Sequence, residues 1–254
     1  MEETGVPGLV QIMNRLLAPG GCPWDREQTH RSLTRYLLEE TYEVIEAIEE
    51  GDMNKLREEL GDLLLQVVFH CAIAQRDGYF DLDEVANGVT NKMITRHPHV
   101  FGDMEINTSD EVLYNWEGFK RNEGKKSILE GIPTILPALL RAYKLQEKAQ
   151  RVGFDWPDVT GAVDKLQEEV VEFTEAGRDQ ESRRNEMGDL LFALVNIARM
   201  SEIEPEEALQ ETNNKFIRRF QHIEKTLEAR NEPIEEAGLE KLDTLWNEAK
   251  DLGL

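Results

Sequence analysis

The residues best suited to chemistry are carboxylates that occur in pairs on two successive predicted helices. Glu40 and Glu43 are three residues apart, so they are neighbours on one face of the first helix. Glu59 and Asp62 have the same spacing near the start of the second helix. Four acidic groups with no histidine or cysteine among them are ligands typical of Mg²⁺ or Mn²⁺ rather than zinc. The pattern therefore predicts a divalent-cation site between the two helices.

The second of these helices, predicted over residues 54–77, makes the metal hypothesis stronger. From Leu60 to Val68 it is apolar on nearly every side, which predicts that it is buried. Carboxylates on a buried wall repel one another and are costly unless they are paired or bind a metal. Few basic residues lie near these acids or near the matching acids of the second half of the chain, namely Lys55, Arg57 and Lys165. A buried network of salt bridges is the alternative to a metal site.

Both carboxylate motifs recur in the second half of the chain, which predicts a tandem duplication. Three segments match in order and at nearly constant separation: LEETYEV at 38–44 with QEEVVEF at 167–173, ELGDLL at 59–64 with EMGDLL at 186–191, and NKMITR at 91–96 with NKFIRR at 214–219. The repeated unit of about 120 residues is a duplicated domain rather than a solenoid repeat. Its second copy supplies Glu169, Glu172, Glu186 and Asp189.

The elements that must position these carboxylates are all helical. Apolar residues recur at helical spacing, and runs with strand-like alternation are absent. We predict an all-α protein of two helical domains, 1–123 and 137–254, joined by a linker over 124–136 that contains GKKS and Pro133. The predicted helices cover residues 5–18, 31–50, 54–77, 82–95, 109–122, 137–151, 159–177, 181–202, 206–230 and 234–250.

Basic and aromatic residues also recur at matching positions of the repeat. Lys92 and Arg96 are four residues apart, as are Lys215 and Arg219, so each pair can grip phosphate oxygens from one helical face. The alternative is that they are ordinary surface cations. Trp116 and Trp246, each four residues before a lysine, could stack on a base or fill the core. Mg²⁺ held by carboxylates keeps positions open for phosphate oxygens, so the set favours phosphoryl chemistry.

The overall charge excludes several classes of partner. Lys and Arg number 29 and Asp and Glu 51, which gives a net charge of −22. Such a chain lacks the basic face that nucleic acid or an anionic membrane requires. The two cysteines have no paired spacing, and the first residues lack a signal peptide, so we expect a cytoplasmic protein. A metal ion would reconcile the acidic protein with an acidic substrate.

Histidines carry only weak signals. Glu27 and His30 have the Glu-x-x-His spacing of di-iron carboxylate proteins, but the spacing occurs once and its copy lacks it. His70 lies on an apolar helix and is expected to be a core histidine. Neither supports a second metal centre.

Together these motifs resemble the MazG family of nucleoside triphosphate pyrophosphohydrolases. The resemblance rests on Glu-Glu-x-x-Glu followed by Glu-x-x-Asp, found at 39–62 and again at 168–189, and on CPWD at 22–25, RHPHVFG at 96–102 and VGFDW at 152–156. It runs over essentially the whole chain, and the doubled motif is typical of the two-domain bacterial form. The resemblance implies a four-helix core in each unit and an intertwined homodimer. It also implies Mg²⁺-dependent cleavage of a nucleoside triphosphate into a monophosphate and pyrophosphate.

The resemblance assigns roles residue by residue. Metal ligands would be Glu40, Glu43, Glu59 and Asp62 in the first unit and Glu169, Glu172, Glu186 and Asp189 in the second. Nucleotide contacts would be Lys92, Arg96, Trp116 and Lys120 in the first unit and Lys165, Lys215, Arg219, Trp246 and Lys250 in the second. Tyr36 stands where Lys165 would be matched, so the first unit lacks that cation, although it keeps every carboxylate.

A mechanism follows as a hypothesis. Glu39 or Glu168 orients a water molecule for in-line attack on the α phosphorus, beside metals held by the other carboxylates. A narrower enzyme of the same superfamily, acting on dUTP, dCTP or phosphoribosyl-ATP, is one alternative. A helical regulatory module without catalysis is another.

Overall fold

The structure, a computed structural model, describes residues 4–104, 108 and 127–254. The chain divides into two compact units, Met1–Lys120 and Arg121–Leu254. Every regular element among the described residues is a helix, which confirms the predicted all-α class. The predicted helix over 109–122 and the start of the predicted linker lie outside the described residues, so the proposed domain limits stay a prediction.

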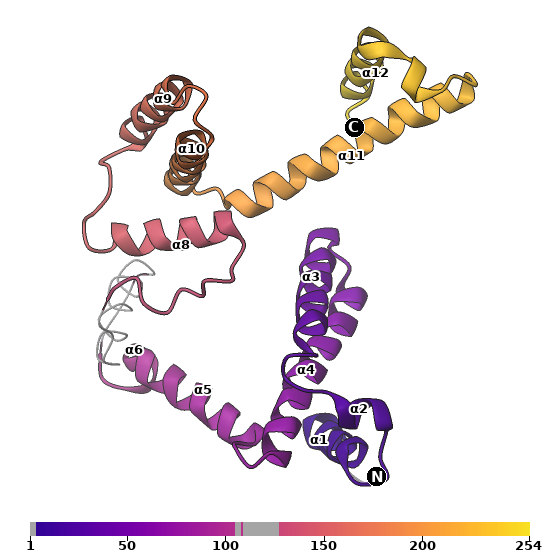
Figure 1. The fold of residues 1–254 in the computed structure, drawn as a ribbon. Coiled ribbons are helices and arrows are strands. Elements are labelled where there is room, and N and C mark those ends of the chain that lie inside the picture. Colours follow the sequence, from indigo (N-terminus) through magenta and orange to yellow (C-terminus); the bar gives the residue numbers. More distant parts are fainter. Residues whose placement is uncertain (1–3, 105–107, 109–126) are drawn as a thin grey trace. The chain divides into compact units, whose positions relative to one another are not determined.

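Unit 1 contains six helices in its described part (Figure 1). They are α1 (Gly5–Leu17), α2 (Pro23–Glu27), α3 (Thr34–Glu50), α4 (Met53–Arg76), α5 (Leu82–Arg96) and α6 (Pro98–Phe101). The four longer helices confirm the predicted ones to within about three residues, the usual scatter of helix ends. The short helices α2 and α6 were not predicted, because one or two turns carry too little periodicity to detect.

A tight turn folds α3 back on α4 and fixes the carboxylate-bearing hairpin. Gly51 ends α3 in the left-handed conformation at φ 68°, which glycine adopts without steric cost. Asp52 then caps α4, because its side chain accepts hydrogen bonds from the backbone N–H groups of Asn54 and Lys55. The two helices therefore run antiparallel and pack along their length.

The core of unit 1 lies at the other end of this hairpin. Residues from α1, from the segment before α3 and from the second half of α4 form it: Met13, Leu17, Leu33, Val68, Phe69, Ala72 and Ile73. The first half of α4 is less covered than its sequence predicts. Leu60, Leu64 and Val67 are 48%, 38% and 38% exposed. The predicted burial of this stretch is wrong for a single chain, because α1 and α3 cover only one side of α4.

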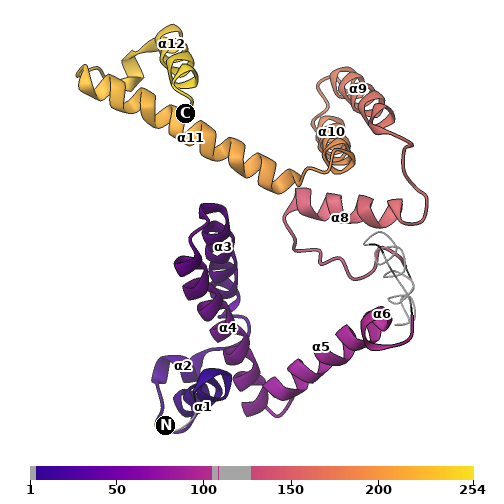
Figure 2. The ribbon, with the colours of Figure 1, turned by 180° about the vertical axis from the view of Figure 1, so that it is seen from behind.

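Unit 2 repeats the hairpin and adds a long helix. Its elements are α8 (Ala138–Gln150), α9 (Val159–Glu175), α10 (Gln180–Met200), α11 (Pro205–Ala229), a 3₁₀ turn (Ile234–Glu236) and α12 (Gly238–Asp251). The helix predicted over 234–250 is interrupted, because Gly238 takes a positive φ of 70° between the 3₁₀ turn and α12. In both ribbon views α12 lies along α11 (Figures 1 and 2), and Ile223, Leu227 and Leu245 form their shared core.

Within the described ranges, none of the helices has the length and apolarity needed to cross a membrane.

Candidate metal and nucleotide site

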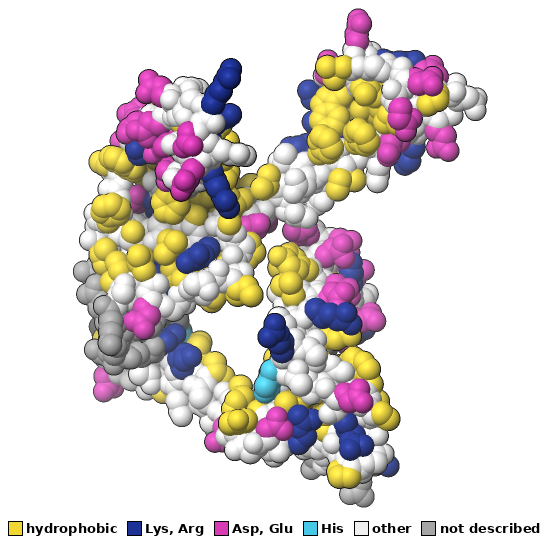
Figure 3. Space-filling model, in the orientation of Figure 1, with side chains coloured by type: hydrophobic (Ala, Val, Ile, Leu, Met, Phe, Trp, Pro, Cys, Tyr) yellow, Lys and Arg dark blue, Asp and Glu magenta, His cyan; other side chains and the backbone are white. Residues whose placement is uncertain are grey.

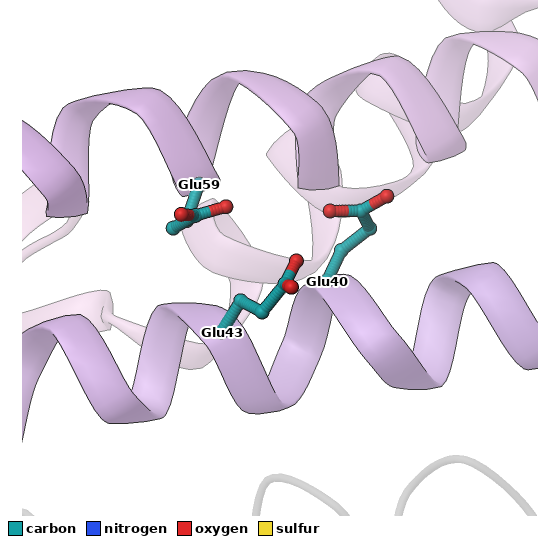
Figure 4. A group of neighbouring side chains, drawn as sticks. All are labelled: Glu40, Glu43 and Glu59. Carbon is teal, nitrogen blue, oxygen red and sulfur yellow. The ribbon is translucent and has the colours of Figure 1, made fainter.

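In unit 1, three of the predicted carboxylates converge between α3 and α4 (Figure 4). Glu40 and Glu43 project from α3 and Glu59 projects from α4. One carboxylate oxygen from each lies within 4.8 Å of those of the other two. The (i, i+3) spacing on α3 places two acids on the face towards α4, and the hairpin supplies the third.

The carboxylates of unit 1 are close enough to perturb one another. Burial, followed by the charges of Asp62 and Glu43, raises the pKa of Glu40. Burial, followed by Glu43 and Glu58, raises the pKa of Glu59. Asp62 is outside the three-oxygen group, yet its charge acts on both acids. These shifts mean that the site disfavours negative charge unless a cation is supplied.

The nearest lysine of unit 1 does not neutralise this cluster. Lys55 pairs instead with Glu46 at 2.6 Å and with Glu50 at 3.0 Å. Among the described residues, no ion pair joins a lysine or arginine to Glu40, Glu43 or Glu59. The salt-bridge alternative therefore does not account for the unit 1 cluster, and the three oxygens are arranged as a cation site would need.

In unit 2, the matching hairpin of α9 and α10 gathers Glu169, Glu186 and Asp189, again with oxygens within 4.8 Å of one another. Glu169 is only 6% exposed, whereas Asp189 is exposed. Glu172 lies outside the three-oxygen group, but burial, followed by the charge of Glu169, raises its pKa. The duplicated spacing thus produces a second cluster of the same kind with a more deeply buried member.

A lysine enters the unit 2 cluster. The Lys165 Nζ is 2.8 Å from an oxygen of Glu168 and 2.8 Å from an oxygen of Glu169. Hydrogen bonds to these two acids raise the pKa of Lys165. Unit 2 thus realises part of the salt-bridge alternative, because one of its buried carboxylates already has a cation.

The remaining cations of unit 2 lie on α11 and α12. Arg219 places its guanidinium 5.5 Å from the ring centre of Trp246 and donates from Nε to the Leu254 carbonyl oxygen at 2.7 Å. Trp246 packs against the core of the α11–α12 pair and lies 5.1 Å from the ring of Phe216, so it fills core on at least one side. Lys250 donates to Asn247, and Lys215 is half-buried.

Within each unit, the described residues do not bring these cations to the carboxylates of the same unit. In unit 2, α12 packs on α11, whereas the carboxylates lie between α9 and α10. In unit 1, Lys92 and Arg96 lie on α5, apart from the α3–α4 cluster, and Trp116 and Lys120 fall outside the described residues. Glu39 is exposed beside Glu40, and Glu168 is held by Lys165.

Two side-chain pairs near the ends of the hairpins were not predicted. His30 and His70 meet at 2.8 Å in unit 1, and Asp155 and Arg199 meet in a buried ion pair in unit 2. The partners are 40 and 44 residues apart, so no local spacing reveals them. The recurrence of an aromatic-Asp dipeptide at 24–25 and 154–155 was the only related signal.

Comparison with known proteins gives a consistent result. A family model described as the MazG nucleotide pyrophosphohydrolase domain matches residues 28–101 and again residues 158–224, which confirms the duplication. The chain is 46% identical over 256 residues to the nucleoside triphosphate pyrophosphohydrolase/pyrophosphatase MazG of Thermotoga maritima, covering 98% of each protein. It is 45% identical over 251 residues to the nucleoside triphosphate pyrophosphohydrolase of Escherichia coli K12, covering 95% of each.

Proposed function

Because the chain belongs to the MazG nucleotide pyrophosphohydrolase family, we propose that it hydrolyses nucleoside triphosphates to nucleoside monophosphates and pyrophosphate, with a broad range of ribo- and deoxyribonucleotides as substrates. The observation that carries the proposal is the pair of carboxylate clusters, one on each helical hairpin matched by the family model. Three carboxylates with oxygens within 4.8 Å of one another destabilise the folded chain unless they bind a cation.

Mg²⁺ is the cofactor that fits these clusters, with Mn²⁺ as a substitute. The donors are all carboxylate oxygens, and within the described part of unit 1 no lysine or arginine forms an ion pair with Glu40, Glu43 or Glu59. Glu40, Glu43, Glu59 and Asp62 would hold the ion in unit 1, and Glu169, Glu172, Glu186 and Asp189 would hold it in unit 2. When bound, the metal neutralises charge on the triphosphate and on the departing pyrophosphate.

The protein side chains divide the remaining work. Glu39 or Glu168, next in sequence to a ligand, orients a water molecule and accepts its proton as the water oxygen bonds to the α phosphorus and the bond to the bridging oxygen breaks. Lys165, Lys215, Arg219 and Lys250 bind phosphate oxygens, and Trp246 presents a ring face to the base. Lys92, Arg96, Trp116 and Lys120 are their counterparts in unit 1.

A second copy of the chain completes the site in this proposal, as an intertwined homodimer. The carboxylates and the α11–α12 cations are separate in one chain, and the outer faces of the hairpins are apolar. Leu191, Phe192 and Leu194 on α10 are 47%, 45% and 49% exposed. Figure 3 shows hydrophobic side chains gathered over the α11–α12 pair as well. A second copy would cover these faces and supply the missing helices of a four-helix core.

Complementation tests the shared site. In chains that also carry Glu43→Gln, so that only the unit 2 site is intact, Glu172→Gln and Arg219→Ala should each abolish activity, whereas the two chains unfolded and refolded together should regain part of the rate, because one unit 2 site of the heterodimer carries neither substitution. Light scattering should give a mass of twice 29.2 kDa. A monomer of full activity, or a mixture as inactive as its parents, would contradict the shared site.

The activity itself is tested by pyrophosphate release from a nucleotide panel in Mg²⁺. We expect the Glu43→Gln and Glu172→Gln double variant to lose about 100-fold or more, because several kcal/mol of metal-dependent stabilisation are removed. Glu46→Gln and Glu175→Gln make the same change on the same helices outside the clusters and should retain activity. The single variants show which unit contributes more.

The panel also separates the alternatives. Turnover confined to dUTP, dCTP or phosphoribosyl-ATP would replace the broad substrate range with a narrow one. Mg²⁺-independent binding of partners with no triphosphate turnover would replace the enzyme with a regulatory module.

A further inference from the structure

The histidine pair of unit 1 has an unusual geometry. The Nδ1 atoms of His30 and His70 are 2.8 Å apart, the ring centres are 5.1 Å apart and the ring planes differ by 4°. The ring centres are farther apart than the nitrogens by about twice the distance from an imidazole centre to its own nitrogen. Both nitrogens therefore lie on the line between the ring centres. The rings lie edge to edge in one plane and share a head-on hydrogen bond.

The hydrogen bond between the two Nδ1 atoms contains one proton, and a second proton does not fit between these atoms. One Nδ1–H donates and the other Nδ1 must keep its lone pair to accept. A single added proton at an outer nitrogen keeps the bond and gives it charge-assisted character. When both rings are fully protonated, two N–H groups face each other at the junction and the contact cannot form. His70 resists this state, because burial, followed by the charge of His30, lowers its pKa.

The surroundings of the pair offset only part of a second positive charge, because the hydrogen bond from Arg76 and, more weakly, the charge of His30 lower the pKa of the Asp77 carboxyl. The charged groups that the described residues place beside it are Asp77 and Arg76, at the end of α4. They pair with each other at 2.9 Å, and Arg76 also donates to the Arg26 carbonyl oxygen from α2. From the α1 and α3 sides the neighbours are apolar, including Leu33 at 1% exposure. The buried Nε2 of His70 has no hydrogen-bond partner among the described residues.

The pair sits where it can set the geometry of the carboxylate hairpin. His30 lies in the turn before α3, which carries Glu40 and Glu43. His70 lies on α4, which carries Glu59. The hydrogen bond therefore joins the start of one carboxylate-bearing helix to the other, at the end of the hairpin opposite the Gly51 turn.

In unit 2 the corresponding end of the α9–α10 hairpin is joined by an ion pair between side chains of types that do not ordinarily change their charge at neutral or mildly acidic pH. Asp155, three residues before the cap of α9, meets Arg199 of α10, and the side chains are 15% and 5% exposed. Arg199 also donates to the Asn196 side chain at 2.8 Å. The ordinary pKa values of the aspartate and arginine side-chain types lie well outside the range between about pH 5 and about pH 8, in which histidine changes its charge.

We propose that His30 and His70 are a positioning pair that holds the start of α3 against α4 and opens when both rings are protonated, so that unit 1 loosens in mild acid while unit 2 does not. The core of Leu33, Val68 and Phe69 keeps the unit folded when the pair opens. Only the consequence for metal binding and catalysis rests on the proposed function, and the tests below need neither.

The first test follows the imidazole nitrogens of the intact protein by ¹⁵N NMR as the pH is lowered. We expect His30 and His70 to titrate as a coupled pair, with the second proton binding at clearly lower pH than the first. Replacing either one by Gln should return the other to a single ordinary titration. His222→Gln removes a titratable ring of unit 2 and should leave the pair unchanged. Two independent titrations in the wild-type protein would overturn the hydrogen-bonded pair.

The second test measures amide hydrogen exchange at the start of α3 and of α9 in one sample, corrected for intrinsic rates. Between about pH 7.5 and about pH 5.5 we expect α3 to lose about tenfold in protection and α9 to lose none. The double variant His30→Asp with His70→Arg carries the unit 2 chemistry and should abolish the acid response. Parallel behaviour of α3 and α9, or an acid response that survives in both single Gln variants, would overturn the proposal.

Discussion

The two carboxylate clusters share their spacing but differ in how their charge is balanced. In unit 1 Glu40, Glu43 and Glu59 face one another without an ion pair to any described lysine or arginine, and the position that matches Lys165 is Tyr36. In unit 2 Lys165 reaches into the cluster and holds Glu169 at 2.8 Å. The two copies of the repeat thus share their acidic residues and differ in the basic residue that pairs with them.

This difference shows two competing ways to stabilise an acidic cluster, pairing with a lysine and binding a metal ion. A resident lysine lowers the cost of burying Glu169, but it occupies an oxygen that a metal would use. A cluster without a lysine keeps its oxygens available and bears the repulsion until an ion arrives. We therefore expect the two units to respond differently to metal, to loss of the lysine and to pH.

The largest expected effect is that of metal removal. With a chelator in excess, pyrophosphate release should fall by about 100-fold or more, and added Mg²⁺ should restore it, because the charge of triphosphate and carboxylates is then uncompensated. Glu40→Gln and Glu169→Gln, compared over a Mg²⁺ titration, rank the two clusters. A rate that is unchanged by the chelator would mean that neither cluster works through a metal.

A smaller effect is expected from Lys165→Met. Loss of a charged contact should raise the nucleotide KM by about tenfold, while Mg²⁺ should half-saturate the enzyme at a lower concentration because its competitor for Glu169 is gone. The matched control is Lys55→Met, since Lys55 pairs with Glu46 and Glu50 outside the unit 1 cluster. If the Mg²⁺ concentration for half-saturation stays the same or rises, Lys165 does not compete with the metal.

The smallest effect is on stability without metal. The pKa of Glu40 is raised, so the folded chain keeps a proton that the unfolded chain has lost, and stability falls as pH rises from the ordinary glutamate value of about 4.3 through the raised one. Glu40→Gln should therefore raise Tm by roughly 2 °C at about pH 7 and leave it unchanged at about pH 4. Glu46→Gln is the control. An equal loss of Tm at both pH values would contradict the idea that the ionised Glu40 carboxylate destabilises the folded chain.

Much of the fold was predictable because helices are encoded locally. The period of apolar residues located α3, α4, α9 and α10, and the structure adds the residues with which two of the helices begin, the cap Asp52 of α4 and the first-turn Pro205 of α11. The short helix α2 and the break at Gly238 were missed, since one turn of helix has no clear period and a glycine can continue or end a helix. The predicted burial of Leu60 failed because a single chain covers one side of α4.

The candidate site divides in the same way. The (i, i+3) spacing of Glu40 and Glu43, and its duplication, follow from sequence alone because a helix fixes which of its residues are neighbours. The convergence of Glu59 on them depends on the antiparallel hairpin, and the histidine pair joins residues that are 40 apart. Such contacts depend on how helices pack, which no local pattern specifies.

The helical class, the duplication and the acidic residues could all be read from the sequence, because they depend on residue types, on the helical period and on the repeat of one motif. The packing of the helices sets which acids each lysine pairs with: Lys165 pairs with Glu169 of its cluster, whereas Lys55 pairs with Glu46 and Glu50 and acts on Glu59 only through its charge. Both lysines have acidic residues three and four positions further along the chain, and a long flexible side chain pairs with whichever carboxylate the packing brings within reach. Charge balance at a buried site is therefore a property of the fold.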